Sequence, residues 1–122
     1  MAQILVVDDS STMREIVSGY LTHNGFEVAV ANDGRDGLKL LQEDAGIKLV
    51  VSDINMPNMD GLTMAEKIRT ELGNTAVRIV MLTTEDNAGM RARGKEIGIT
   101  GWIVKPFRGE AVLGPFRKLC GM

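Results

Sequence analysis

Residues 49–61 have the sequence Leu49-Val50-Val51-Ser52-Asp53-Ile54-Asn55-Met56-Pro57-Asn58-Met59-Asp60-Gly61. The first residues form a short apolar run with two β-branched valines, which predicts a buried strand because helices are usually longer. The run ends on the carboxylate of Asp53, and Pro57 and the Asp60-Gly61 pair then predict a loop. A strand that delivers an acid to the edge of a sheet, followed by a restrained loop, is typical of sites in open α/β folds.

The composition is that of a globular domain. The chain has 122 residues, of which 44% are hydrophobic and 25% charged, so it can bury a core without disulfides. A net charge of -2 argues against a nucleic-acid surface and a polybasic membrane patch. The one cysteine, Cys120, cannot form an internal disulfide, which fits a reducing cytosol. The apolar run at residues 4–7 is too short for a signal peptide or a membrane span, so we expect a single cytoplasmic, monomeric domain over residues 1–122.

Apolar runs alternate with helical patterns along the whole chain. Strands are predicted at Ile4–Val7, Phe26–Ala31, Leu49–Asp53, Arg78–Thr83 and Gly101–Val104. A helix follows each strand, and the last two helices are expected at about residues 86–97 and 109–119. This alternation predicts βαβ units, and hence a doubly wound α/β fold with a parallel sheet. In the strand order 2-1-3-4-5, the first and third strands would be neighbours, but the pattern alone leaves this order open.

Three acids would meet at one edge of such a sheet. Asp8 and Asp9 follow the first strand, and Asp53 ends the third. Their mutual repulsion must be relieved, either by raised pKa values or by a hard cation. Oxygen ligands with one open side suit Mg²⁺, beside which a carboxylate oxygen could attack phosphorus and form an acyl phosphate. Thr83 and Lys105, at the ends of two further strands, can donate a hydrogen bond and a positive charge to phosphoryl oxygens.

Each of these residues taken alone has a plainer explanation. Acids after a strand often form turns or helix caps, Thr83 can cap the helix that follows it, and a lysine before a proline is common in loops. The functional interpretation therefore depends on the combination. Four separate strand ends each carry a group that takes part in one reaction.

The combination closely resembles the response-regulator receiver domain, in particular its single-domain chemotaxis type. The resemblance covers the whole chain and is carried by Asp8-Asp9, Asp53 with Met56-Pro57 and Asp60-Gly61, Thr83, and Lys105-Pro106-Phe107. It implies a flavodoxin-like (βα)5 fold with five parallel strands in the order 2-1-3-4-5.

The resemblance also implies the chemistry of the acids. Asp53 would be the phosphoacceptor, which receives its phosphoryl group from a phosphohistidine of a sensor histidine kinase. Mg²⁺ would be held by Asp9, by the Asp53 side chain and by the backbone carbonyl of Asn55. Asp8 would reach the metal through a water molecule.

Further roles follow from the same resemblance. Lys105 would bind the phosphoryl group, and the peptide bond after it is usually cis in the family. Thr83 would move toward the phosphoryl group and make room for Trp102 to swing inward, a two-state element biased by a local charge. Asn55 and Glu85 match the chemotaxis type, in which the acyl phosphate is short-lived.

The sequence departs from the family pattern at an aromatic residue and at several glycines. Trp102 stands where the family usually has Tyr or Phe, and its bulkier indole needs a partner for its N–H when buried. Gly37 in the second helix, and Gly89 and Gly94 in the fourth, each lower helix stability by about 1 kcal/mol. We therefore expect an altered, looser output face.

The last helix contains Pro115. In a regular turn, proline removes a hydrogen bond and clashes with the preceding turn, which costs about 3 kcal/mol. A helix that ends near Leu113 and restarts with Pro115 at its first position avoids this. We expect a kinked or broken last helix that still packs four residues inward: Val112, Phe116, Leu119 and Cys120.

Several functions remain open. The first is a stand-alone response regulator that acts on a flagellar motor switch protein through the face of the fourth helix, last strand and last helix; a phosphorelay intermediate or a kinase regulator is the alternative. A Mg²⁺-dependent aspartyl-phosphate phosphohydrolase is disfavoured, because Asn55 and Ser10 stand where a second acid would follow Asp53 or Asp8 by two residues. A flavin-binding module is disfavoured because the acids after the first strand would repel the cofactor.

Overall fold

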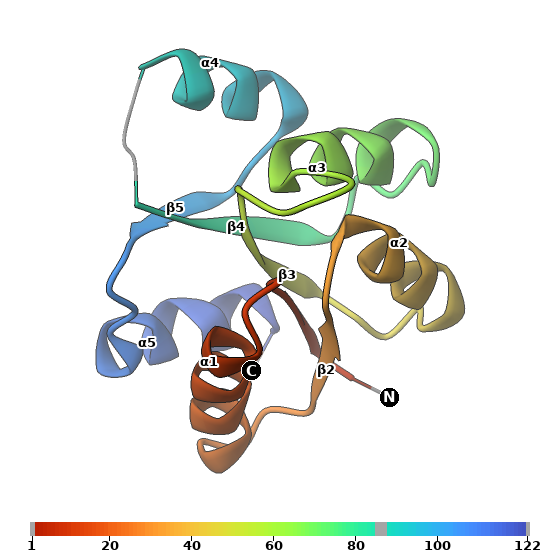
Figure 1. Ribbon diagram of the computed structural model, residues 1–122. Helices are drawn as coiled ribbons and strands as arrows, with labels where there is room; N and C mark the ends of the chain where they lie inside the picture. The colour runs from red at the N-terminus through yellow and green to blue at the C-terminus, as the bar shows by residue number, and fades with distance from the viewer. Residues whose placement is uncertain (1, 85–87, 122) are drawn as a thin grey trace.

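The computed structural model describes residues 2–84 and 88–121 (Figure 1). Five parallel strands form one sheet in the order β2-β1-β3-β4-β5, which confirms the predicted fold and order. The strands are β1 Ile4–Val7, β2 Val28–Ala31, β3 Leu49–Asp53, β4 Arg78–Thr83 and β5 Gly101–Val104. Glu85, expected to affect acyl-phosphate lifetime, and positions 86 and 87 of the expected fourth helix lie outside the described residues.

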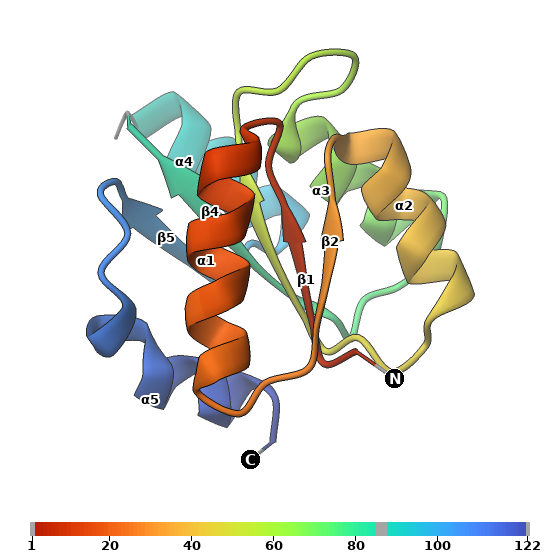
Figure 2. The same ribbon diagram turned by 60° about the horizontal axis from the view of Figure 1, so that its bottom comes forward.

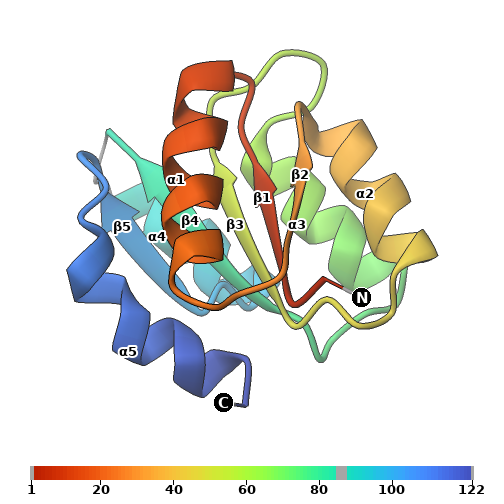
Figure 3. The same ribbon diagram turned by 90° about the horizontal axis from the view of Figure 1, so that it is seen from below.

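Five helices cover the two faces of the sheet. They are α1 Ser11–His23, α2 Gly34–Glu43, α3 Gly61–Thr70, α4 Ala88–Ile97 and α5 Gly109–Leu119. Helices α1 and α5 lie on one face, and α2, α3 and α4 lie on the other (Figures 2 and 3). Because the strands are parallel, their carboxyl ends lie at the same edge of the sheet.

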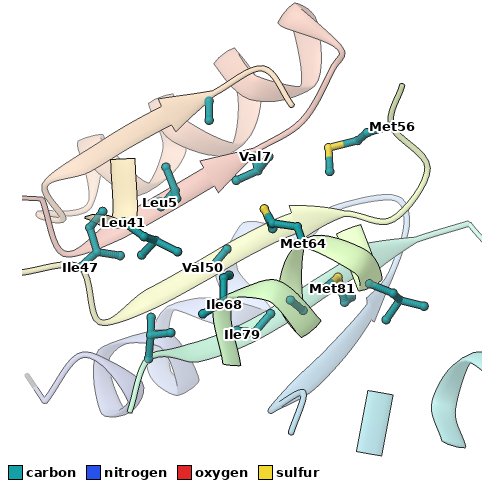
Figure 4. Close-up of a cluster of buried hydrophobic side chains, with 14 of the residues drawn as sticks. Leu5, Val7, Leu41, Ile47, Val50, Met56, Met64, Ile68, Ile79 and Met81 are labelled. Atoms are coloured by element: carbon teal, nitrogen blue, oxygen red, sulfur yellow. The ribbon is translucent and has the colours of Figure 1, made fainter. Parts of the chain in front are cut away.

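The core has two layers, one on each face of the sheet. Side chains of a parallel strand alternate between faces, and both faces are covered, so the central strands are apolar throughout. One layer packs under α2 and α3 and includes Leu5, Val7, Val50, Met64 and Met81 (Figure 4). The other packs under α1 and α5 and includes Ile4, Val6, Val51, Leu82 and Phe116.

The second strand begins later than the sequence pattern predicts. Phe26 was expected in the strand, but its N–H donates to the carbonyl of Leu21 at 3.1 Å, and the Gly25 N–H donates to Thr22 at 3.1 Å. Gly25 has a φ of 95°. This is the hydrogen-bond pattern of a glycine-terminated helix end. Phe26 therefore closes α1, and pairing in β2 starts at Val28.

Of the two predicted forms of the last helix, kinked or broken, the break is wrong, and the kink stays a prediction. Helix α5 is continuous from Gly109 to Leu119, with Pro115 inside it. A residue before proline is kept out of helical geometry partly by a clash between its Cβ and the proline ring. That residue is the exposed Gly114, which has no Cβ, so this part of the clash is absent. The inward packing is confirmed, because Val112, Phe116 and Cys120 are buried and Leu119 packs against them.

Gly37 in α2 allows close packing of this helix against α3 and β1. Gly37 is buried, and a Cβ at this position would lie 3.0 Å from the Met64 sulfur on α3 and 3.2 Å from a Val7 methyl on β1. Glycine lowers the intrinsic stability of α2. It also lets α2 approach its neighbours closely, which the sequence pattern did not reveal.

Candidate functional site

Three carboxylates converge at the carboxyl edge of the sheet. Pairing of β1 with β3 sets Val7 beside Ser52, so the residues that follow β1 lie next to the end of β3. One carboxylate oxygen from each of Asp8, Asp9 and Asp53 lies within 4.8 Å of the others. Asp8 and Asp53 are 1% and 8% exposed, whereas Asp9 is exposed. The cluster is thus buried on one side and open on the other.

Asp8 is held at both its backbone and its side chain. Its N–H donates to Ala31 at 3.2 Å, and its carbonyl accepts from Arg14 Nη1 at 2.6 Å. Its Oδ1 accepts from the Ser10 N–H at 2.9 Å. Its Oδ2 is buried, and no described residue donates a hydrogen bond to it. A buried oxygen without a partner is unfavourable, so this atom is available to a water molecule or to a bound cation.

The electrostatics of the cluster follow from burial and crowding. Burial raises the pKa of the Asp8 carboxyl above its ordinary value, and the neighbouring charges of Asp53 and Asp9 raise it further. The hydrogen bond from Ser10 and the positive charge of Lys105 act in the opposite direction. The acids therefore repel one another, and a bound cation would relieve the repulsion.

Asp53 lies beside the lysine predicted to act with it. Its Oδ1 accepts from the Ile54 N–H at 2.9 Å and lies 3.3 Å from Lys105 Nζ. The Lys105 N–H donates to the Thr83 carbonyl at 2.8 Å, which ties the loop after β5 to the end of β4. The peptide bond between Lys105 and Pro106 is cis, as the family resemblance implied.

The loop after β3 is closed tightly onto the end of the strand. The Gly61 N–H donates to Ile54 at 2.7 Å, and a Cβ on Gly61 would collide with the Asp53 carbonyl. The Asp60 side chain caps α3 by accepting from the Thr63 N–H at 2.7 Å. Asn55 lies exposed in this loop, directly after the buried Ile54. The Asp60-Gly61 pair thus fixes the loop that follows the candidate phosphoacceptor.

Thr83 and Trp102 lie on the same side of the sheet. Thr83 is buried at the end of β4, and Trp102 on β5 pairs with Met81, two residues before Thr83. The Trp102 indole lies against α4, where the Arg91 guanidinium is 5.3 Å from the ring centroid. The family-implied switch pair is therefore brought into one region, with the indole seated on the helix.

Gly94 makes room for that indole. It is the one buried residue among those described in α4, and a Cβ on it would collide with the Trp102 ring. Trp102 and Gly94, which both depart from the family pattern, thus form one packed pair. The sequence pattern indicated only that Gly94 lowers helix propensity, because the size match with a residue on another element cannot be seen along the chain.

The donor set suits a small hard cation. Mg²⁺ prefers oxygen ligands, retains several waters, and binds through one or two carboxylates together with substrate phosphates. The cluster offers carboxylate oxygens, an unpartnered buried Asp8 oxygen and an open side at Asp9. Asp8, Asp9 and Asp53 are therefore residues that could hold the metal.

Comparison with known proteins identifies the family. Residues 4–114 match the family described as the response regulator receiver domain. The chain belongs to this family.

Among its relatives is the chemotaxis protein CheY1 of Helicobacter pylori, 38% identical over 106 residues that cover 86% of each chain. A CheY homologue of Campylobacter jejuni is 39% identical over 86% of this chain and 82% of its own. The structure of Vibrio cholerae CheY4 has a TM-score of 0.89 at 39% identity and covers 98% of both chains. A CheY-like receiver domain of Methanospirillum hungatei, 23% identical, has a TM-score of 0.90 and agrees in fold. No described helix is long and apolar enough to span a membrane.

Proposed function

We propose that this chain is a phosphorylation-dependent signalling switch with Asp53 as the phosphoacceptor. Asp53 ends the central strand, lies beside the carboxylates of Asp8 and Asp9, and has Lys105 Nζ at 3.3 Å. This arrangement is the observation that carries the proposal. It presents a carboxylate as nucleophile and a cation for the phosphoryl oxygens at the same point.

The proposed reaction moves a phosphoryl group from a phosphohistidine of a sensor histidine kinase to Asp53. A carboxylate oxygen attacks phosphorus, the new O–P bond forms, and the P–N bond breaks. The electron pair of that bond stays on the imidazole, which takes a proton from water. Later attack by water on the phosphorus returns the carboxylate and releases inorganic phosphate.

The surrounding residues have distinct proposed roles. Asp9, Asp53 and the Asn55 carbonyl would hold Mg²⁺, with Asp8 reaching it through water, and the bound metal would supply positive charge that offsets the charge on the phosphoryl group. Lys105 binds a phosphoryl oxygen. Thr83 donates its hydroxyl to another phosphoryl oxygen. Asn55, with Glu85 outside the described residues, influences how long the acyl phosphate lasts.

The proposed output is a change in partner binding rather than turnover of a substrate. The chain is similar to chemotaxis proteins of Helicobacter, Campylobacter and Vibrio. We therefore propose a cytoplasmic, monomeric, single-domain regulator that contacts a flagellar motor switch protein, with no nucleic-acid or membrane partner. A phosphorelay intermediate or kinase regulator is the alternative.

The proposed partner surface comprises α4, β5 and α5. A groove of about 700 Å³ lies between β5 and α5, lined by apolar residues such as Ile103 and Phe116. Arg108 and Lys118 also line it, and Val104 on the edge strand is 49% exposed. Apolar surface with positive charge beside it suits a partner segment that carries both apolar and acidic residues.

Labelling with acetyl phosphate tests the proposed acceptor. With Mg²⁺ present, the wild type is expected to gain one acid-stable, base-labile phosphate, and Asp53→Asn none. Asp36→Asn, an exposed acid-to-amide change on α2, serves as the matched control and should label normally. Undiminished labelling of Asp53→Asn, with the phosphate mapped elsewhere, contradicts the assignment. Catalytic turnover of a phosphomonoester would instead favour the phosphohydrolase.

The proposed output is tested by binding to the motor switch protein with and without beryllium fluoride, a phosphoryl mimic. Binding should strengthen at least tenfold with beryllium fluoride and Mg²⁺, and Asp53→Asn should not respond. Normal labelling of Asp53 without any binding to the motor protein would support the phosphorelay alternative.

A further inference from the structure

We propose that Arg14 is a positioning residue for the cation site, because it fixes the peptide that joins Asp8 to Asp9. The inference rests on the proposed function, since it concerns the metal that the acids would hold. Nothing in the motif pattern singles out Arg14. Its role becomes visible only from the conformation of the turn between β1 and α1.

Arg14 reaches back from the first turn of α1 to the strand end. Its Nη1 donates to the Asp8 carbonyl at 2.6 Å, and its own N–H donates to the Ser10 carbonyl at 2.9 Å. Ser10 caps the helix by accepting from the Met13 N–H at 3.3 Å. The first turn of α1 and the turn that carries the acids are therefore one hydrogen-bonded unit.

The hydrogen bond acts on the acid that is otherwise least restrained. The Asp8 side chain is held by Ser10, and its N–H by Ala31. No described residue donates a hydrogen bond to the Asp9 carboxylate. The position of Asp9 then depends on its backbone, and the Asp8 carbonyl belongs to the same peptide unit as the Asp9 N–H. By fixing that carbonyl, Arg14 fixes the direction from which Asp9 enters the cluster.

Charge and position make opposite predictions for Arg14. A guanidinium near the acids repels a bound cation, so electrostatics alone predicts that its removal tightens Mg²⁺ binding. Loss of the carbonyl's partner frees the peptide to rotate and moves Asp9, which weakens binding. Partners that orient metal ligands typically contribute about 10-fold to 100-fold in metal affinity. We expect the loss of the hydrogen bond that positions Asp9 to outweigh the loss of the repelling charge. Arg14→Met should therefore bind Mg²⁺ about tenfold more weakly than the wild type.

The test is calorimetric titration of the metal-free protein with Mg²⁺ at 25 °C, with circular dichroism to show that each variant is folded. Arg35→Met is the matched control, because Arg35 is an exposed arginine in the first turn of α2. It removes the same charge at the same edge of the sheet, and its affinity should equal or slightly exceed that of the wild type. Arg14→Lys keeps the charge and one donor, and should recover part of the affinity.

A second measurement reports the position of the Asp9 backbone in the metal-free protein. In the metal-free protein, the Asp9 amide should shift in nitrogen–proton NMR spectra of Arg14→Met and stay in place in Arg35→Met. Affinity in Arg14→Met that equals or exceeds the wild type, with an unmoved Asp9 amide, overturns this inference alone. A wild type that binds no Mg²⁺ overturns the metal site of the proposed function, and this inference with it.

Discussion

Helices α3 and α4 have the same length of ten residues and lie side by side on one face of the sheet, yet they are held in different ways (Figure 1). Helix α3 has five buried residues, Gly61, Leu62, Met64, Ala65 and Ile68. The described residues of α4 include a single buried one, Gly94. Because most helix stability in proteins comes from packing an apolar face, α3 is part of the core and α4 rests on it.

Polar contacts from α3 hold the far end of α4. Arg69 donates to the carbonyls of Ile97 at 3.2 Å and Gly98 at 3.0 Å. Arg93 on α4 pairs with Glu66 at 3.3 Å, but both side chains are largely exposed, and such pairs contribute little. The carboxyl end of α4 is thus held by hydrogen bonds from Arg69. The middle of α4 packs against the Trp102 ring. An element held at few points can be released by a local change, which suits the proposed partner surface.

Replacing one isoleucine by alanine on each helix is expected to show the largest difference between α3 and α4 in the free energy of unfolding. Ile68→Ala on α3 removes a fully buried side chain and should lower the free energy of unfolding by about 2–5 kcal/mol. Ile97→Ala on α4 removes a half-buried one and should lower it by less than half as much. Urea denaturation measures both. Equal losses would show that α4 is as much part of the core as α3.

Gly94→Ala tests whether the packing of Trp102 against Gly94 stabilises α4. The added methyl group collides with the indole, and overpacking of this kind costs about 1–3 kcal/mol, which outweighs the gain of about 1 kcal/mol in helix propensity. Trp102 emission should shift as the ring is displaced into water. The exposed Gly89 provides the control, since Gly89→Ala should be neutral or stabilising. Adding Trp102→Phe to Gly94→Ala should restore the lost stability, because the smaller ring leaves room for the methyl group. If stability is not restored, the loss in Gly94→Ala does not come from the collision with Trp102.

The buried carboxylate of Asp8, which follows β1, should lower the stability of the metal-free protein at neutral pH. Since burial raises the pKa of Asp8 in the folded state, folding favours the protonated form. The stability of the metal-free wild type should therefore fall as pH rises through the interval from the ordinary pKa of about 4 to the raised value. Asp8→Asn removes this loss and should therefore be more stable than the wild type at pH 7. Thermal unfolding at pH 3.5 and pH 7 measures the difference, which should shrink at the lower pH.

The sign of that difference is informative. Lower stability of Asp8→Asn at pH 7 would mean that the carboxylate is stabilised by its surroundings rather than strained by them. Mg²⁺ should stabilise the wild type and have little effect on Asp8→Asn, because the metal needs the ionised carboxylate.

The sequence pattern predicted the features that depend on neighbours along the chain. The strands at residues 4–7, 49–53, 78–83 and 101–104 were identified with their bounds, because each is an apolar run with polar residues at its end. The convergence of Asp8, Asp9, Asp53 and Lys105 also required the strand order 2-1-3-4-5, which came from the family resemblance and not from the pattern.

Features that depend on contacts between distant elements were not predictable. The reach of Arg14 to the Asp8 carbonyl requires a particular turn conformation. The close approach at Gly37 depends on which side chains of α3 face it. The continuous helix through Pro115 is different, because its signal lies in the neighbouring Gly114, which has no Cβ to clash with the proline ring.

The match between Gly94 and Trp102 also means that neither position can be changed independently of the other. With glycine at position 94, replacing Trp102 by the Phe or Tyr usual in the family leaves a small void, which costs about 24 cal/mol for each Å³. With alanine at position 94, the indole has no room against the helix. An indole at position 102 in this arrangement therefore requires glycine at position 94, and a change at either position alone disturbs the packing of α4 on β5.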